Sequence, residues 1–69
     1  MWAVGRKCGG KWSFVSRYSR RKGRTGNLDK AVLFENDPDG TDMALGCRDL
    51  LGDHLIRVCD DDGKLRMGV

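Results

Sequence analysis

The sequence lacks any long apolar run, and this absence argues against a membrane-spanning helix. No run of aliphatic or aromatic residues is longer than Ala31–Phe34, whereas a transmembrane helix needs about 20 apolar residues. The first residues do not resemble a secretion signal, because Arg6, Lys7 and Lys11 interrupt each apolar stretch there. We therefore expect a cytoplasmic protein that makes no contact with membranes.

Few residues of the kinds that carry catalysis or bind metals are present. His54 is the single histidine, and its neighbour Asp53 would point to the opposite face of a strand, so the two do not form a catalytic relay. The three cysteines, Cys8, Cys47 and Cys59, lack the C-x2-C spacing of structural zinc sites. Their odd number, without a secretion signal, predicts reduced thiols that pack as small buried side chains. We expect no enzyme, no cofactor and no metal.

The first half of the chain predicts three strands. With 69 residues the chain forms one domain, residues 1–69, with a small core. Met1–Cys8 and Lys11–Tyr18 are rich in aromatic and β-branched residues, and the Gly9–Gly10 pair between them favours a tight hairpin. A third strand is expected at about Lys30–Glu35, after a polar loop.

The second half predicts a helix and a second hairpin. Helical periodicity runs from about Asp42 to Leu51, with Thr41 or Asp42 as the cap and Gly52 as the stop. His54–Cys59 and Lys64–Val69 form two strands around an acidic turn. The helical residues expected to face the core are Met43, Ala44, Cys47, Leu50 and Leu51, with Leu45 pointing away.

The resulting order is β-β-β-α-β-β. We expect an α+β fold, with a small five-stranded, mostly antiparallel sheet and one helix packed on one face. The opposite face would be open to solvent or to a partner. Several strand orders fit this pattern, and pairing of two copies through a sheet edge, Met67–Val69 or Met1–Ala3, is one further expectation.

Charge is divided unequally along the chain. Residues 1–30 hold nine Lys or Arg and one acidic residue, a net charge of +8. Residues 31–69 hold four Lys or Arg and nine Asp or Glu, a net charge of −5. Such a division points to nucleic acid or to a charged partner. It also fits an alternative in which the two halves neutralise each other within the fold.

The basic residues are densest in one segment, RYSRRKGRTG, which begins at Arg17. Five cations in eight residues repel one another and add nothing to a core, so their benefit is solubility or attraction to anions. Arginine matches phosphate geometry, and an aromatic side chain can stack on an unpaired base. Tyr18 is the best placed aromatic residue, because Trp12 and Phe14 are expected in the core. The candidate site residues are Arg17, Tyr18, Arg20, Arg21, Lys22 and Arg24.

Two functions fit these features. The first is a small accessory protein that binds DNA or RNA, with the basic inter-strand loop contacting phosphates. The alternative is a compact protein-interaction module or inhibitor, of the kind that phages and mobile elements encode, which docks on a host protein through charged surfaces. Its partner would be an acidic protein surface, or the acidic half would imitate nucleic acid for a basic partner.

Overall fold

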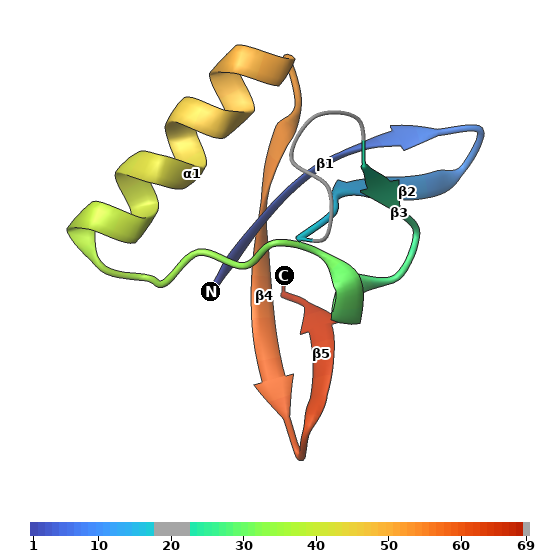
Figure 1. Cartoon of the computed structure of the whole chain (residues 1–69). Coiled ribbons are helices and arrows are strands. Elements are labelled where there is room, and N and C mark those ends of the chain that lie inside the picture. The colour runs from blue at the N-terminus through green and yellow to red at the C-terminus, as the bar shows by residue number, and fades with distance from the viewer. Residues whose placement is uncertain (18–22, 69) are drawn as a thin grey trace.

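The computed structural model of the chain describes residues 1–17 and 23–68 (Figure 1). It contains one antiparallel sheet of five strands in the order β3-β2-β1-β4-β5, together with one α-helix. The predicted α+β class and the order β-β-β-α-β-β are confirmed. The elements are β1 (Trp2–Cys8), β2 (Lys11–Val15), β3 (Arg24–Thr25), the 3-10 helix η1 (Leu28–Lys30), α1 (Pro38–Leu51), β4 (His54–Asp61) and β5 (Lys64–Met67).

Both hairpins form where the sequence predicts them. Gly9 and Gly10 have φ angles of 57° and 81°, the left-handed conformation that a two-residue turn between β1 and β2 requires. In the second hairpin, β4 continues to Asp61 and leaves Asp62 and Gly63 as the turn, with φ angles of 54° and 79°. Figure 1 shows the two hairpins extending in different directions.

The prediction of a third strand at Lys30–Glu35 is wrong. The third strand is β3, and residues 31–34 lie instead between the diverging ends of β1 and β2, whose pairing stops at Gly5 and Phe14. Phe34 exchanges backbone hydrogen bonds of 2.7 and 2.8 Å with Trp2, and the Val32 amide donates to the Val15 carbonyl at 2.9 Å. The segment therefore satisfies backbone groups on both strands but forms only isolated bridges.

Helix α1 begins earlier than predicted and ends where predicted. It starts at Pro38, since Asp37 is the N-cap and its side chain accepts a hydrogen bond of 2.6 Å from the Gly40 amide. Proline suits the first helical position because no backbone donor is needed there. Gly52 ends the helix with a φ angle of 68°.

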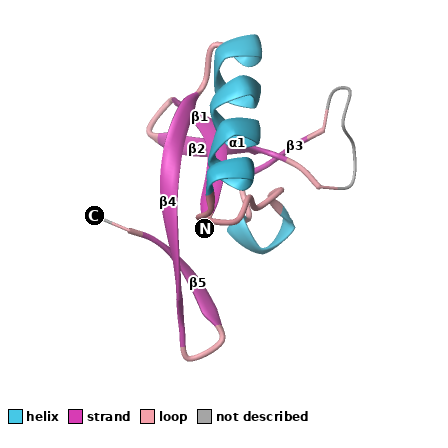
Figure 2. Ribbon diagram, turned by 90° about the vertical axis from the view of Figure 1, so that its left-hand side faces the viewer, coloured by secondary structure: helices cyan, strands magenta, loops and turns pink. Residues whose placement is uncertain are grey.

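The expectation of one open sheet face is wrong, because both faces are covered. Ala3, Phe14, Ile56 and Val58 form a core on one face together with Ala31, and η1 lies against β5 on this side. Helix α1 contacts β1 and β4 on the other face, where Val4 and Ala44 are fully buried (Figure 2). β1 is the central strand of the sheet, so Met1–Ala3 offers no free edge for the expected pairing of two copies. β5 is an outer strand.

The predicted buried face of α1 is largely wrong. Only Ala44 is buried among the five residues expected there, and Cys47 is half-buried. Met43, Leu50 and Leu51 are 64, 85 and 40% exposed. Leu45, which was expected to point away, is half-buried next to the buried Ala44, so α1 turns a different side toward the sheet than the one predicted.

Candidate functional site

Part of the predicted basic segment lies outside the described residues. The predicted site residues in that part are Tyr18, Arg20, Arg21 and Lys22. Its two flanks are held together, because the Ser16 amide donates to the Gly23 carbonyl at 2.9 Å. The Arg17 amide donates to the Lys30 carbonyl at 3.0 Å, which places this residue beside the start of residues 31–34. The structure thus fixes where the segment leaves and rejoins the sheet.

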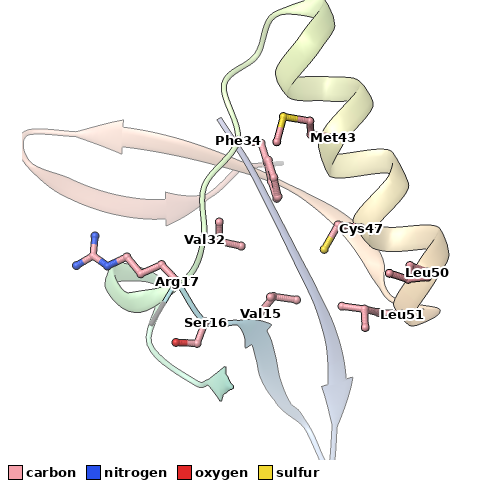
Figure 3. Close-up of a pocket in the computed structure, with 9 residues that line it drawn as sticks. All are labelled: Val15, Ser16, Arg17, Val32, Phe34, Met43, Cys47, Leu50 and Leu51. Atoms are coloured by element: carbon pink, nitrogen blue, oxygen red, sulfur yellow. The ribbon is translucent and has the colours of Figure 1, made fainter. Parts of the chain in front are cut away.

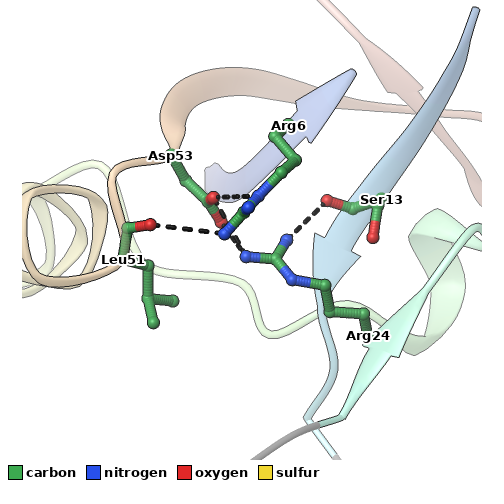
Figure 4. Close-up of polar contacts among 5 residues, drawn as sticks. All are labelled: Arg6, Ser13, Arg24, Leu51 and Asp53. Atoms are coloured by element: carbon green, nitrogen blue, oxygen red, sulfur yellow. Dashed lines mark hydrogen bonds and ion pairs between the residues drawn. The ribbon is translucent and has the colours of Figure 1, made fainter. Parts of the chain in front are cut away.

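Arg24 does not extend from the molecule as an unpaired cation. Its guanidinium donates to both oxygens of Asp53, at 3.0 and 2.8 Å, and to the Ser13 carbonyl at 3.0 Å (Figure 4). Arg6 from β1 donates to the same carboxylate at 2.8 Å and to the Leu51 carbonyl at 3.3 Å. We call Arg6, Arg24 and Asp53 the arginine clasp.

The arginine clasp joins the two oppositely charged halves of the chain. The Asp53 side chain is 0% exposed, whereas both arginines remain partly exposed. Since two cations share one carboxylate, the clasp keeps a net charge of about +1 on its solvent side. In the sequence, Asp53 drew attention only as the neighbour of His54. No local sequence pattern indicates that arginines from β1 and β3 converge on it.

Trp12 lines a shallow hollow on the sheet face that carries the core. Its ring stacks on that of Phe14, with centroids 6.2 Å apart and planes 10° from parallel. Trp12 is half-buried, while Phe14 is only 3% exposed. Trp12 therefore does not lie fully in the core as predicted. The residues that line the hollow are Lys11, Trp12, Phe14, Gly26, Leu28, Leu65 and Met67.

Two exposed lysines flank Trp12. Lys11 lines the hollow, and Lys7 is the cross-strand partner of Trp12, so its side chain starts from the same face. No ion pair among the described residues involves either lysine. None of the described residues that line the hollow carries a carboxylate. An indole with nearby uncompensated cations is suited to stack on a base beside its phosphates.

Trp2, the other described tryptophan, already contacts other side chains through its ring and its indole nitrogen. The Arg57 guanidinium lies 5.5 Å from the centroid of the Trp2 ring, and the indole Nε1 donates to the Thr41 hydroxyl at 3.2 Å. These contacts hold Trp2 between the sheet and α1. Trp12 is therefore the tryptophan that can meet a ligand.

An apolar groove runs between α1 and residues 32–34 (Figure 3). Its volume is about 470 Å³, within the range of about 300–1,000 Å³ typical of ligand sites. Arg17 carries the only charge among the described residues that line it. We call this the α1 groove; its lining residues are Val15, Ser16, Arg17, Val32, Phe34, Met43, Cys47, Leu50 and Leu51.

The three cysteines are free thiols, but the prediction that they are buried is wrong. Cys8 and Cys59 are exposed, and Cys47 is half-buried in the wall of the α1 groove. Burial raises the pKa of the Cys47 thiol above its ordinary value, the Asp53 carboxylate raises it further, and Arg24 lowers it in part. The described residues contain no group of three or more His, Cys, Asp or Glu side chains placed to hold a metal ion.

Comparison with known proteins adds no relative. No family model, no curated protein and no solved structure matches the chain. Within the described residues, no helix is both long enough and apolar enough to cross a membrane.

Proposed function

We propose that the chain is an accessory protein that binds single-stranded DNA or RNA. The observation that carries this proposal is the hollow in which Trp12 lies beside Lys7 and Lys11, with no carboxylate among the described residues that line it. The indole would stack on a base, and the lysines would meet the adjoining phosphates. This is a binding role and not a catalytic one.

The basic segment adds a second group of cations to this role. Arg17, Arg20, Arg21 and Lys22 supply four positive charges close together in the sequence. Arg24, the fifth cation of the predicted site, is held by Asp53 and has less charge to offer a phosphate. We propose that the segment contacts the nucleic-acid backbone without reading its sequence.

The test is binding of a fluorescent single-stranded oligonucleotide, followed by anisotropy. Loss of one stacking contact costs about 1–3 kcal/mol, so we expect Trp12→Ala to weaken binding by about 5- to 150-fold. Trp12→Phe should restore most of the affinity, because the phenyl ring keeps a stacking face. Equal affinity of Trp12→Ala and the unaltered chain, with both folded by circular dichroism, would contradict the stacking role.

Charge reversal tests the contribution of the cations to binding. Lys7→Glu with Lys11→Glu should abolish measurable binding, and Arg21→Glu with Lys22→Glu should weaken it strongly. Lys64→Glu is the control, because Lys64 is exposed and directly precedes Leu65 on β5, so its side chain starts from the strand face opposite to the hollow. A loss of similar size in Lys64→Glu would mean that net charge alone attracts the oligonucleotide.

Pairing of two copies through a sheet edge also stays a proposal. The outer strand that offers such an edge is β5, which carries Lys64 and Arg66. Sedimentation at increasing protein concentration tests it, since an edge-paired dimer would show a rising mass.

A further inference from the structure

His54 is an exposed histidine on the same sheet face as the Trp12 hollow. In the register of the sheet, Gly5 of β1 pairs with Phe14 of β2 on one side and with His54 of β4 on the other. Cross-strand partners project from the same face of a sheet, so the imidazole starts from the face that bears Phe14 and Trp12. No hydrogen bond or ion pair among the described residues involves the His54 side chain. The ring is therefore available to a ligand.

Gly5 leaves the sheet without a side chain between His54 and the aromatic pair of the hollow. The Trp12 ring stacks on Phe14. A Cβ atom at Gly5 would lie 3.0 Å from Cδ1 of Phe14, so the phenyl ring lies close against the glycine. An aromatic surface thus runs from Trp12 through Phe14 onto β1, and the next residue across the sheet is His54.

Lys7 places a positive charge on the strand between the two exposed rings. It follows Gly5 by two residues and so projects from the same face of β1. Trp12 is its cross-strand partner on β2, whereas β4 begins at His54 and offers it no partner. Lys7 forms no ion pair among the described residues. A phosphate that joins stacked nucleosides would meet this ammonium group.

Carboxylates flank the other side of the hollow. Asp60 is the cross-strand partner of Leu65, and Asp29 follows Leu28 in η1. Both acidic residues are exposed, and both leucines line the hollow. A phosphate backbone is repelled on this side and attracted on the side of Lys7. The charges therefore give a bound strand one favourable direction, which leads across β1 toward β4.

We propose that a nucleic-acid strand bound at the hollow continues across β1 and stacks a second base on His54. The ligand is then a single strand of more than one nucleotide. One base lies on Trp12, a following base lies on His54, and the phosphates between them lie beside Lys7. Histidine is among the side chains on which unpaired bases stack. This inference rests on the proposed function, because it extends the same site to a second base.

The single histidine makes a direct test possible. His54 is the only histidine of the chain, so its imidazole protons give signals in the proton NMR spectrum that no other histidine overlaps. Titration with the thymidine trinucleotide TpTpT should shift these signals upfield, because the ring current of a stacked base shields them. Thymidine 5′-monophosphate carries one base, which Trp12 would take, and should shift them much less. No upfield shift at saturating trinucleotide would overturn the inference.

Substitutions at His54 separate stacking from charge. His54→Ala should weaken binding of TpTpT by about fivefold or more, and His54→Phe should restore it because the phenyl ring keeps a stacking face. His54→Lys has a cation but no ring, so it should bind less tightly than His54→Phe. Cys59→Ala is the control, because Cys59 is also exposed on β4 but projects from the opposite face. Restoration by lysine and not by phenylalanine would overturn the inference.

The outcomes distinguish this inference from the proposed function. If Trp12→Ala weakens binding of TpTpT and His54→Ala does not, the strand binds at the hollow without reaching His54, and the inference alone fails. If the unaltered chain binds neither TpTpT nor a longer single strand, the proposed function fails and the inference with it. Equal losses in His54→Ala and Cys59→Ala would also overturn the inference, because the effect would not belong to the face of the hollow.

Discussion

The carboxylate of Asp53 accepts hydrogen bonds from arginines of two different strands, and its side chain has no contact with water. The residue directly follows Gly52, which ends α1, and its amide donates to the Arg48 carbonyl at 3.0 Å. One acidic side chain thereby joins the end of the helix to β1 and β3. A buried carboxylate of this kind requires its partners, because an unpaired charge at such a position is costly.

Asp53→Asn tests the contribution of the arginine clasp. The amide keeps the shape but removes the charge and places N–H donors against guanidinium groups. Removing one partner of a buried ion pair costs about 3–5 kcal/mol; because both arginines keep contact with water, we expect about 2–3 kcal/mol by urea denaturation. Asp49→Asn, which breaks the exposed Arg48–Asp49 pair, should cost about 0.5 kcal/mol or less. Similar losses in the two variants would mean that the clasp contributes no more than a surface pair.

The three thiols should differ in reactivity. The thiolate is the reacting species, so a raised pKa lowers the reactive fraction at neutral pH. Cys47 combines a raised pKa with partial burial. We expect iodoacetamide to label the exposed Cys8 and Cys59 first, and labelling of Cys47 to accelerate as the pH is raised. Mass spectrometry of a time course checks this, with urea-unfolded protein as the control. Labelling of Cys47 at the rate of Cys8 at neutral pH would contradict it.

At the scale of elements, the sequence predicts the hairpins and the helix end because local chemistry decides them. Gly9–Gly10 and Gly52 adopt left-handed conformations that other residues resist, so their positions are legible without knowledge of the fold. The residues 31–34 have the composition of a strand, but their conformation depends on the gap between β1 and β2. That gap arises from where the β1–β2 pairing stops, which no local pattern shows.

The start of α1 offers a test of capping. Asp37→Ala removes the side chain that accepts from the Gly40 amide, so the first turn loses its cap. We expect a loss of about 1 kcal/mol in unfolding free energy by urea denaturation. Asp42→Ala, further along the same helix, should change stability by about 0.3 kcal/mol or less. If the two variants were equally stable, Asp37 would not act as the cap.

The orientation of α1 shows a different limit of the sequence. Helical periodicity identified the apolar stripe, and the stripe exists, but periodicity assumes that the most apolar side faces the core. Ala44 is buried and Leu45 half-buried instead, and Leu50 remains exposed. The α1 groove was for this reason not predictable from the sequence.

At the scale of the whole molecule, the strands of the two oppositely charged halves lie side by side in the sheet and meet where β1 pairs with β4. β1 and β2 from the basic half pair with each other, and β4 from the acidic half pairs with β1. Among the ion pairs of the described residues, those that join the halves all end on Asp53. Neutralisation of one half by the other therefore explains the ion pairs of Arg6 and Arg24, but it does not explain the charges of Lys7 and Lys11.

This distribution predicts a strong dependence of nucleic-acid binding on salt. If about four cations contact phosphates, affinity for a single strand should fall on the order of 50-fold between 50 and 200 mM salt. Lys7→Glu should make the salt dependence shallower, by about 0.7 in the slope of log affinity against log salt. Titrations by anisotropy at several salt concentrations measure both, and a flat response would contradict an electrostatic mode of binding.

Only part of the candidate site could be predicted from the sequence. The density of cations after Arg17 is a local property and needs no structure to detect. The hollow is not a local property of the sequence, because it brings Trp12 from β2 next to Leu28 of η1 and Leu65 of β5. Those contacts depend on strand register and on the relative directions of the two hairpins, and neither follows from hydrophobic alternation alone.

The central position of β1 has a consequence for synthesis of the protein. β1 is synthesised before the other strands of the sheet, yet one of its two neighbours, β4, begins only at His54. During translation the nascent chain therefore carries β1 with one side unpaired until β4 has left the ribosome. The sheet closes late, and a ribosome that stalls before His54 would release a fragment with an unpaired, aggregation-prone strand.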